Sequence, residues 1–151
     1  MPPEDTHFQI EATAPIAVGK FMVSPGYWTS DLEVPGDPSF VMVPPVNQWL
    51  NSYTFGIPDT AESTKISLIS TIPATTAEEI SVDGVPVTAA EYTPIGTSGY
   101  GIATVDLTGT GSHHTATAPD PSILFSVEVY AQSTYSSFFH MAGYGLAPIN
   151  P

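Results

Sequence analysis

The sequence has very few basic residues. Lys20 and Lys65 are the only lysines, arginine is absent, and fifteen acidic residues give the 151-residue chain a formal net charge of −13. Binding to nucleic-acid phosphates or to anionic membrane surfaces is driven by lysine and arginine. The composition therefore excludes nucleic acid as a partner. The acidity is ordinarily explained by solubility and mutual repulsion, with cation binding or a saline habitat as the alternative.

Cysteine is absent altogether, and no apolar run reaches eighteen residues. No disulfide framework or thiol chemistry is available, so cysteine usage leaves the cellular compartment open. A membrane-spanning helix needs about 20 apolar residues, so we expect no direct membrane insertion, and no signal peptide is recognisable. A domain excised from a larger secreted or surface protein would also show neither a signal peptide nor a membrane-spanning run. We interpret residues 1–151 as one such domain.

Stretches free of proline and glycine are also scarce. Sixteen prolines and twelve glycines leave no window of fifteen residues without either, apart from the run 124–142. Both residue types interrupt helices, so long helices have almost nowhere to form. Only 11% of the residues are charged, so Ser, Thr, Asn and Gln must provide much of the polar surface, as is typical of β-proteins. We therefore expect an all-β domain with at most one or two short helical turns.

Side-chain alternation predicts antiparallel strands. The Asp83-Gly84 pair between two β-branched runs is typical of a type I′ hairpin, because both central residues of that turn need positive φ. Residues 7–13, 16–23, 39–43, 65–72, 99–107 and 123–130 also have strand character, and residues 46–55 combine a helical turn with a strand. About nine or ten strands predict an antiparallel two-sheet β-sandwich, jelly-roll-like, with a single core. The predicted core contains Ile66, Leu68, Val82, Ile102 or its neighbours Ala103 and Val105, Phe125, Val127 and Val129.

Motifs for catalysis are not found in the sequence. There is no Gly-x-Ser-x-Gly elbow and no cysteine nucleophile, and the Ser-rich tail has no adjacent base. Glu78 and Glu79 fall on a loop edge, where neighbouring acids are usually solvated. The short Gly109-Thr-Gly111 segment has no lysine with which to hold a phosphate. We therefore predict that the protein is not an enzyme.

Two sets of residues are candidate metal ligands. His113 and His114 would need Asp106 or Asp120 and a further histidine to bind zinc, because adjacent residues of a strand point to opposite faces. Four aspartates lie at predicted turns, where a carboxylate ordinarily caps its own backbone: Asp37, Asp59, Asp83 and Asp120. Calcium would require several of these oxygens to converge from different loops. We expect no metal or other cofactor, with calcium left open as the alternative.

Large aromatic residues without a clear period mark the candidate contact surface. They occur in the irregular stretch from Ser24 to Pro38 and in the aromatic, Ser-rich tail after Gln132. The predicted ligand-binding residues are Tyr27, Trp28, Tyr135, Phe138, Phe139 and Tyr144. Aromatic side chains that escape a core tend to become contact anchors. The alternative, that they plug the edges of the core, stays open at this point.

The order of short motifs resembles the N-terminal domain of IgGFc-binding proteins. The matching pieces are Pro15-Ile-Ala-Val18, Gly36-Asp-Pro-Ser-Phe40, Val43-Pro-Pro-Val-Asn-Gln-Trp49, Tyr53-Thr-Phe55, Ile66 to Ile69, Val82-Asp-Gly-Val-Pro86, Gly99-Tyr-Gly-Ile-Ala103, Gly111 with His113 or His114, Val127-Glu-Val-Tyr130, and a Ser-Tyr-rich end near 135–143. The resemblance covers roughly residues 14–145. It implies the fold and an adhesive, extracellular role, and it carries over neither a site residue nor antibody binding.

These observations together predict a non-enzymatic binding or adhesion module, extracellular or at a cell surface, that contacts a protein or a glycan. Two alternatives stay open. The chain could be a structural subunit that self-assembles into a fibre or homo-oligomer through exposed edge strands or its aromatic tail. It could also be a calcium-dependent carbohydrate-binding module of jelly-roll type.

Overall fold

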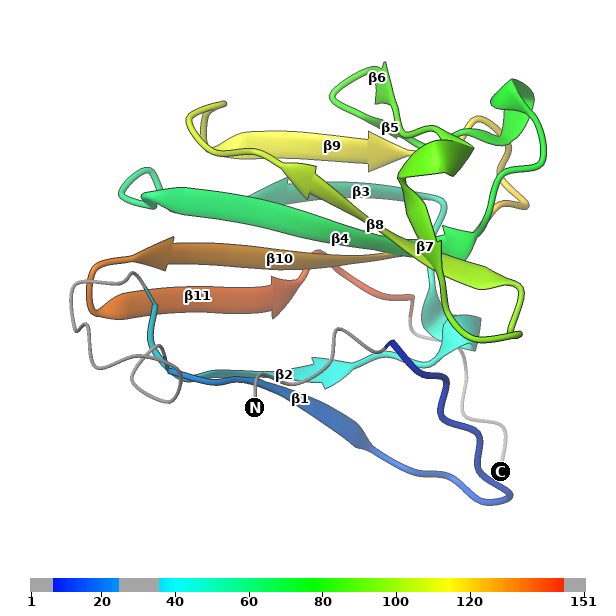
Figure 1. Cartoon of the computed structure of the whole chain (residues 1–151), viewed down its shortest axis with the longest axis horizontal. Helices are drawn as coiled ribbons and strands as arrows, with labels where there is room; N and C mark the ends of the chain where they lie inside the picture. Colours follow the sequence, from blue (N-terminus) through cyan, green and yellow to red (C-terminus); the bar gives the residue numbers. More distant parts are fainter. Residues whose placement is uncertain (1–6, 25–35, 146–151) are drawn as a thin grey trace.

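A computed structural model describes residues 7–24 and 36–145 of the chain (Figure 1). Within these two ranges the chain forms eleven strands in three antiparallel sheets and no α-helix. The helical content of the described part is limited to the 3-10 turns η2 (Val46–Gln48), η3 (Thr76–Glu78) and η4 (Ala89–Glu91). The all-β prediction is confirmed, with three short turns in place of one or two.

The largest sheet has five strands. Their order is β11 (Ser136–Met141), β10 (Ser126–Ser133), β4 (Ser63–Thr71), β8 (Tyr100–Asp106) and β7 (Tyr92–Pro94). The central strand β4 pairs with β10 on one side and β8 on the other, so that Leu68 lies opposite both Val127 and Ala103. These three apolar side chains face the same way, because directly paired residues point to one face of a sheet.

A four-stranded sheet covers one face of the larger one. Its order is β3 (Ser52–Gly56), β9 (His113–Thr117), β5 (Ser81–Val82) and β6 (Val85–Pro86). Asp83 and Gly84 join β5 to β6 with φ angles of 51° and 81°. The predicted Asp-Gly hairpin is therefore confirmed, and positive φ at both turn positions explains why this residue pair stands there.

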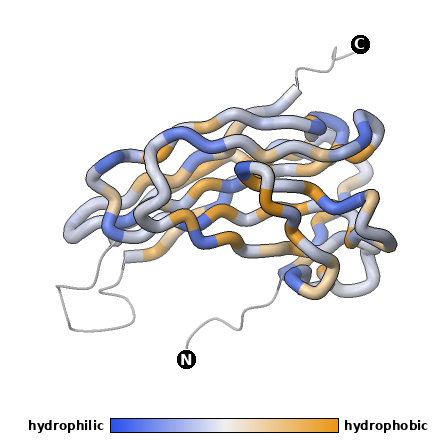
Figure 2. The backbone as a smooth tube through the Cα atoms, turned by 90° about the horizontal axis from the view of Figure 1, so that it is seen from above, coloured by the Kyte–Doolittle hydropathy of each residue, from blue (hydrophilic) through white to orange (hydrophobic). Residues whose placement is uncertain are grey.

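The core lies between these two sheets, as expected for a β-sandwich. Hydrophobic and hydrophilic residues alternate along many of the strands (Figure 2). Five of the predicted core residues are 0% exposed: Ile66, Leu68, Phe125, Val127 and Val129. Of the other predicted core residues, Val82, Ile102 and Ala103 are buried and Val105 is partly buried. The strand alternation thus predicted the core correctly.

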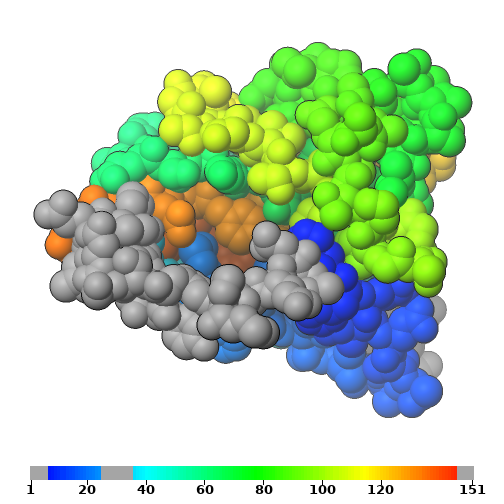
Figure 3. All heavy atoms as spheres, viewed as in Figure 1, coloured from blue at the N-terminus to red at the C-terminus, as the bar shows by residue number. Residues whose placement is uncertain are grey.

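The third sheet is a two-stranded ribbon made of β1 (Val18–Met22) and β2 (Ser39–Val43). It lies on the side of the five-stranded sheet away from β9 (Figures 1 and 3). Strand β2 is next to β11 (Figure 1). The Gly36 amide donates a hydrogen bond to the Ser133 carbonyl at 3.1 Å, and the Asp37 amide donates to Ser137 Oγ at 2.5 Å. The chain that enters β2 is therefore fixed to the β10–β11 turn.

Several strand predictions differ from the structure. Residues 7–13 were expected to form a strand but form none, because they are exposed and no neighbouring strand pairs with them. The next strand begins at Val18, two residues later than predicted. Strands β7 and β11 were not predicted, and β9 was considered only at His113 and His114. In β11, adjacent Phe138 and Phe139 obscure the alternation. Most of the irregular stretch from Ser24 to Pro38 lies outside the described residues.

Candidate binding surface

The predicted aromatic residues of the tail do not form one continuous surface. Tyr135 lies in the turn between β10 and β11, with φ 60° and 70% exposure, whereas Tyr144 follows the far end of β11 and is 53% exposed. Six residues of strand span about 20 Å, so the two rings are well separated. Tyr27 and Trp28 lie outside the described residues. A binding role for these four aromatics stays a prediction.

The two phenylalanines of β11 have different environments, because adjacent residues of a strand point to opposite faces. Phe139 is 8% exposed and stacks on Tyr130 with ring centroids 4.5 Å apart. Phe138 is 43% exposed and packs against His140 at 4.7 Å. Phe139 thus packs within the structure, as the core-plug alternative expects, while Phe138 has surface available for contact.

A different apolar surface lies on the outer face of the ribbon, which we call the ribbon face. It is formed by Gly19, Phe21, Phe40 and Met42. Phe21, Phe40 and Met42 are 73%, 49% and 50% exposed. The strands alternate, so Val18, Lys20, Met22, Val41 and Val43 point the other way, toward the body of the domain. Large exposed apolar residues that adjoin one another mark interaction sites on soluble proteins.

Phe21 and Phe40 form the centre of the ribbon face. They are directly paired across β1 and β2, and their ring centroids are 4.7 Å apart at an interplanar angle of 44°. The Phe40 ring also lies over Gly19, since a Cβ atom built on Gly19 would be 2.5 Å from Phe40 Cε2. Only glycine leaves room for the ring in this position. Glycine weakens a strand, and its presence inside one often marks such a close approach.

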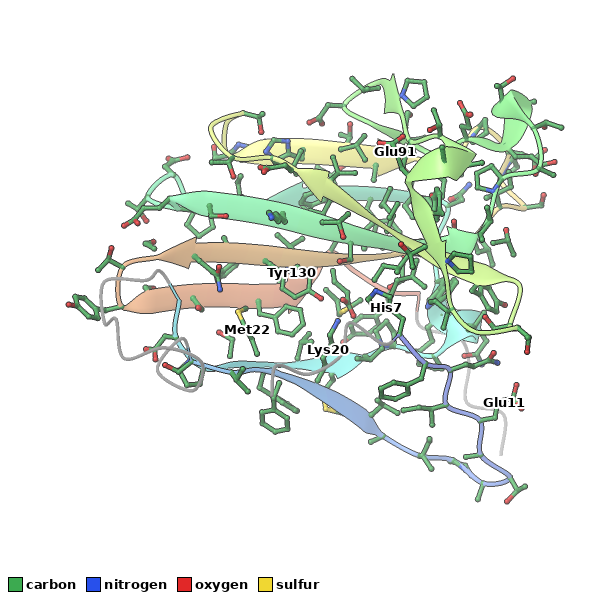
Figure 4. The ribbon with its side chains drawn as sticks, in the orientation of Figure 1. His7, Glu11, Lys20, Met22, Glu91 and Tyr130 are labelled. Carbon is green, nitrogen blue, oxygen red and sulfur yellow. The ribbon has the colours of Figure 1, made fainter. Side chains whose placement is uncertain are left out.

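The opposite, inner face of the ribbon is fixed by a polar cluster. Lys20 Nζ lies 2.6 Å from Glu128 Oε2 and 2.7 Å from the Tyr130 hydroxyl, and that hydroxyl donates a short hydrogen bond to the same carboxylate oxygen. Figure 4 shows Lys20 and Met22 pointing from β1 toward Tyr130 on β10. Lys20 also lies over the rings of Tyr130 and Phe139, at 5.3 and 5.8 Å from their centroids.

Glu128 is the buried member of this cluster and depends on the other two residues. Its side chain is only 2% exposed, whereas that of Lys20 is 43% exposed. A buried carboxylate is costly without a cation and hydrogen-bond donors, and Lys20 and Tyr130 provide both. Burial raises the pKa of Tyr130, and the Glu128 charge and hydrogen bond raise it further. The phenol therefore remains protonated and donates to Glu128. The sequence did not indicate this cluster, because Lys20 and Glu128 are 108 positions apart.

The histidine pair is used structurally. His114 is 2% exposed, and its Nδ1 and Nε2 lie 2.7 Å from Asp83 Oδ2 and 3.0 Å from the Gly111 carbonyl. Both ring nitrogens are thus already engaged. His113 points to the other face, as expected from strand alternation, and its Nδ1 contacts Ser112 Oγ at 3.0 Å. Among the described residues, no three His, Cys, Asp or Glu side chains converge as metal ligands.

Two of the four turn aspartates, Asp83 and Asp120, also have structural partners. Asp120 Oδ1 accepts hydrogen bonds from the Ser122 amide at 2.8 Å and the Ser122 hydroxyl at 2.6 Å, which confirms its predicted capping role. Asp83 instead accepts from the Thr115 amide of the neighbouring strand at 2.8 Å, in addition to its contact with His114. These carboxylates hold the loops in place, and none of them points to a shared site.

The ribbon face was missed in the sequence. Residues 16–23 and 39–43 were predicted as strands, but no exposed apolar face was assigned to them. Only the pairing of the two strands apart from both larger sheets leaves these side chains exposed. Lys20 gives no guide to this arrangement, because a charged side chain in a strand ordinarily marks the exposed face, and here it points inward to Glu128.

No helix in the described part of the chain is long and apolar enough to cross a membrane. Comparison with curated proteins gives no significant match. Comparison with solved structures likewise gives none. A family profile described as IgGFc binding protein matches residues 2–131, most of the chain, and agrees with the resemblance seen in the order of the motifs. The chain therefore belongs to the IgGFc binding protein family.

Proposed function

We propose that this chain is a non-enzymatic, extracellular binding or adhesion module whose partner is a protein at a cell surface. The observation that carries the proposal is the exposed ribbon face, found on a member of a family named for binding a protein. The Fc part of an antibody is an extracellular protein, which supports the location. The family name does not by itself make Fc the partner of this chain.

The chemistry of the ribbon face favours a protein over a glycan. Phe21, Phe40 and Met42 provide apolar contact area, and Gly19 adds no polar side chain. Sugar recognition combines a flat aromatic surface with several polar groups that fix the hydroxyls, whereas the two rings here are tilted by 44° to each other. Aromatic side chains and Met are enriched at protein interfaces. Calcium-dependent glycan binding is therefore the weaker alternative.

The polar groups favour binding over catalysis. A general base needs a side chain that can reach the substrate, as does a nucleophile. The buried Glu128 carboxylate is held by Lys20 and Tyr130, and both nitrogens of His114 have partners. These two clusters contribute to the fold, whereas the side chains of the ribbon face are exposed and available to a partner.

The experiment is a binding survey with the purified folded domain on purified extracellular proteins, including IgG Fc, and on an array of glycans. We expect saturable binding to at least one protein, retained after its glycans are removed enzymatically and retained in EDTA. Heat-unfolded domain serves as the control for non-specific adsorption. Binding restricted to glycans, or binding that requires calcium, would contradict the proposal.

Self-assembly is tested separately by sedimentation of the domain alone. We expect a monomer across the concentrations used in the binding survey, because the charge of −13 makes copies repel one another. A fibre or a stable oligomer, without binding to any protein of the survey, would support the structural-subunit alternative instead.

A further inference from the structure

We infer that the ribbon face docks a cationic protein segment, one with apolar side chains at its centre and lysine or arginine around them. This inference rests on the proposed function and specifies the chemistry of the partner. It follows from three observations: an apolar centre, a rigid support beneath it, and a strongly acidic chain whose two lysines do not lie on this face.

The apolar centre is shaped by the sequence. Gly19 allows the Phe40 ring to lie across β1, and Phe21 packs against that ring at 4.7 Å. Met42 pairs with Gly19 across the ribbon and extends the same face. None of these four positions carries a charge. A partner must therefore offer apolar side chains here, since a buried charge without a counter-charge would be costly.

The ribbon is held in position before any partner arrives. Lys20 binds Glu128 and Tyr130 from the inner face, and Gln132 Nε2 lies 3.3 Å from Met22 Sδ. The chain entering β2 is hydrogen-bonded to the β10–β11 turn. A surface that is already ordered loses little conformational entropy on binding. The anchoring of β1 and β2 thus suits the ribbon face to recognition.

Charge selects the kind of partner. Asp37 lies two residues before β2, and Glu11 lies in the segment that leads to β1; both are exposed. Of the two lysines of the chain, Lys20 is paired with Glu128 beneath the ribbon, and Lys65 is on β4 of another sheet. Neither lysine therefore places a positive charge on the ribbon face. A cationic segment is attracted by the net charge of −13.

The same argument disfavours a second copy of this chain. Two ribbon faces in contact would bring together two chains of charge −13 with no cation on either face to offset the repulsion. Anionic nucleic acids and anionic lipid surfaces are disfavoured for the same reason. We therefore expect no self-association through the ribbon face, and finding it would overturn the inference.

The test uses three synthetic peptides of equal length as probes. One alternates Lys with Phe, one alternates Lys with Ser, and one alternates Glu with Phe. Binding to the full chain is measured by calorimetry at 150 mM salt. We expect the Lys/Phe peptide to bind at least about tenfold more tightly than either of the others, and its affinity to fall as salt is raised, because charge attraction is screened.

Variants locate the site. Phe21→Ser with Phe40→Ser should weaken binding of the Lys/Phe peptide at least about tenfold, with a melting temperature within a few degrees of the parent. Val85→Ser is the matched control, since Val85 is 68% exposed on β6 of a different sheet. Met42→Lys, which changes one exposed residue, serves if the double variant does not fold, and it should weaken binding of the same peptide.

Three outcomes would overturn the inference. The Lys/Ser peptide could bind as tightly as the Lys/Phe peptide, which would show attraction by charge alone. The ribbon variants could bind the Lys/Phe peptide like the parent chain, which would place contact elsewhere. The parent chain could self-associate in a way that the ribbon variants abolish. Protein binding in the survey, unaffected by the ribbon variants, would leave the proposed function standing while this inference fails.

Discussion

Lys20 Nζ on β1 lies 2.6 Å from Glu128 Oε2 on β10, and this ion pair ties the ribbon to the outer face of the five-stranded sheet. The two residues are 108 positions apart. The ion pair holds the Glu128 side chain in a buried position between the five-stranded sheet and the ribbon. Because Lys20 points to this buried side, its neighbours Gly19 and Phe21 on β1 point outward. One contact therefore connects the stability of the domain with the presentation of the ribbon face.

Replacing Lys20 with Met should destabilise the domain by about 3 kcal/mol, because it leaves the buried Glu128 carboxylate without its cation. The partial exposure of Lys20 places the expected cost toward the lower end of values for buried pairs. Chemical denaturation measures the free energy of unfolding. The double variant Lys20→Met with Glu128→Gln should regain much of the loss. A double variant as unstable as Lys20→Met alone would show that the ion pair is not the cause.

Truncating Phe125 to Ala should cost about 3–5 kcal/mol, the range for removal of a large buried aromatic ring. Phe125 is 0% exposed and packs edge-on against Tyr53 at 5.1 Å, while the Tyr53 hydroxyl donates to the Phe125 carbonyl. Leu124→Ala is the neighbouring control, since Leu124 is 43% exposed. Equal losses for the two variants, measured by urea denaturation, would contradict the described core.

Asp83 makes the stability of the domain depend on acid pH. Burial raises the pKa of Asp83, but hydrogen bonds from His114 and Thr115, with the charge of His114, outweigh it and hold the pKa below its usual value. A carboxyl with a lowered folded-state pKa stabilises the fold above its unfolded pKa of about 3.9. That contribution is lost as the pH falls through the lower, folded-state pKa.

The measurement is the free energy of unfolding between about pH 6 and 2.5, for the parent and for Asp83→Asn. Asparagine tolerates the positive φ of this turn and removes the charge. We expect a shallower fall in stability for the variant at acid pH. Asp106 and Asp120, whose pKa values are also lowered by hydrogen bonds from Thr108 and Ser122, remain in both proteins. Identical pH profiles for the two proteins would show that Asp83 does not contribute to the pH dependence of the free energy of unfolding.

Calcium should leave the melting temperature unchanged. A ligand that binds only the folded state raises the melting temperature, and a chelator reverses the effect. The carboxylates of Asp83 and Asp120 already accept hydrogen bonds, and the described residues hold no cluster of three metal-binding side chains. The measurement is thermal unfolding in millimolar calcium and in EDTA. A clear rise with calcium would revive the calcium-dependent alternative.

The parts of the fold that depend on local chemistry could be predicted. Asp83-Gly84 specified its hairpin, because few residues accept positive φ, and Phe125, Val127 and Val129 specified an inward strand face by alternation. Residues 7–13 show why alternation is not sufficient. A strand also needs a partner, and partner choice depends on contacts that are distant in the sequence.

The candidate site depended on such distant contacts. Phe21 and Phe40 look like core residues in the sequence, and only the separate pairing of β1 with β2 exposes them. Phe139 looked like a contact residue, and its stacking on Tyr130 beneath Lys20 buries it. Sequence periodicity shows which side chains share a face. It does not show whether another sheet covers that face.

The most direct test of the central claim is a hydrogen-exchange footprint of the domain in complex with a protein that it binds in the survey. The account predicts that amides of residues 18–23 and 39–43 gain protection in the complex, with little change at residues 133–137 and 142–145. Protection confined to those two flanks of β11, with the ribbon unchanged, would contradict it and would place the interface on the aromatic tail.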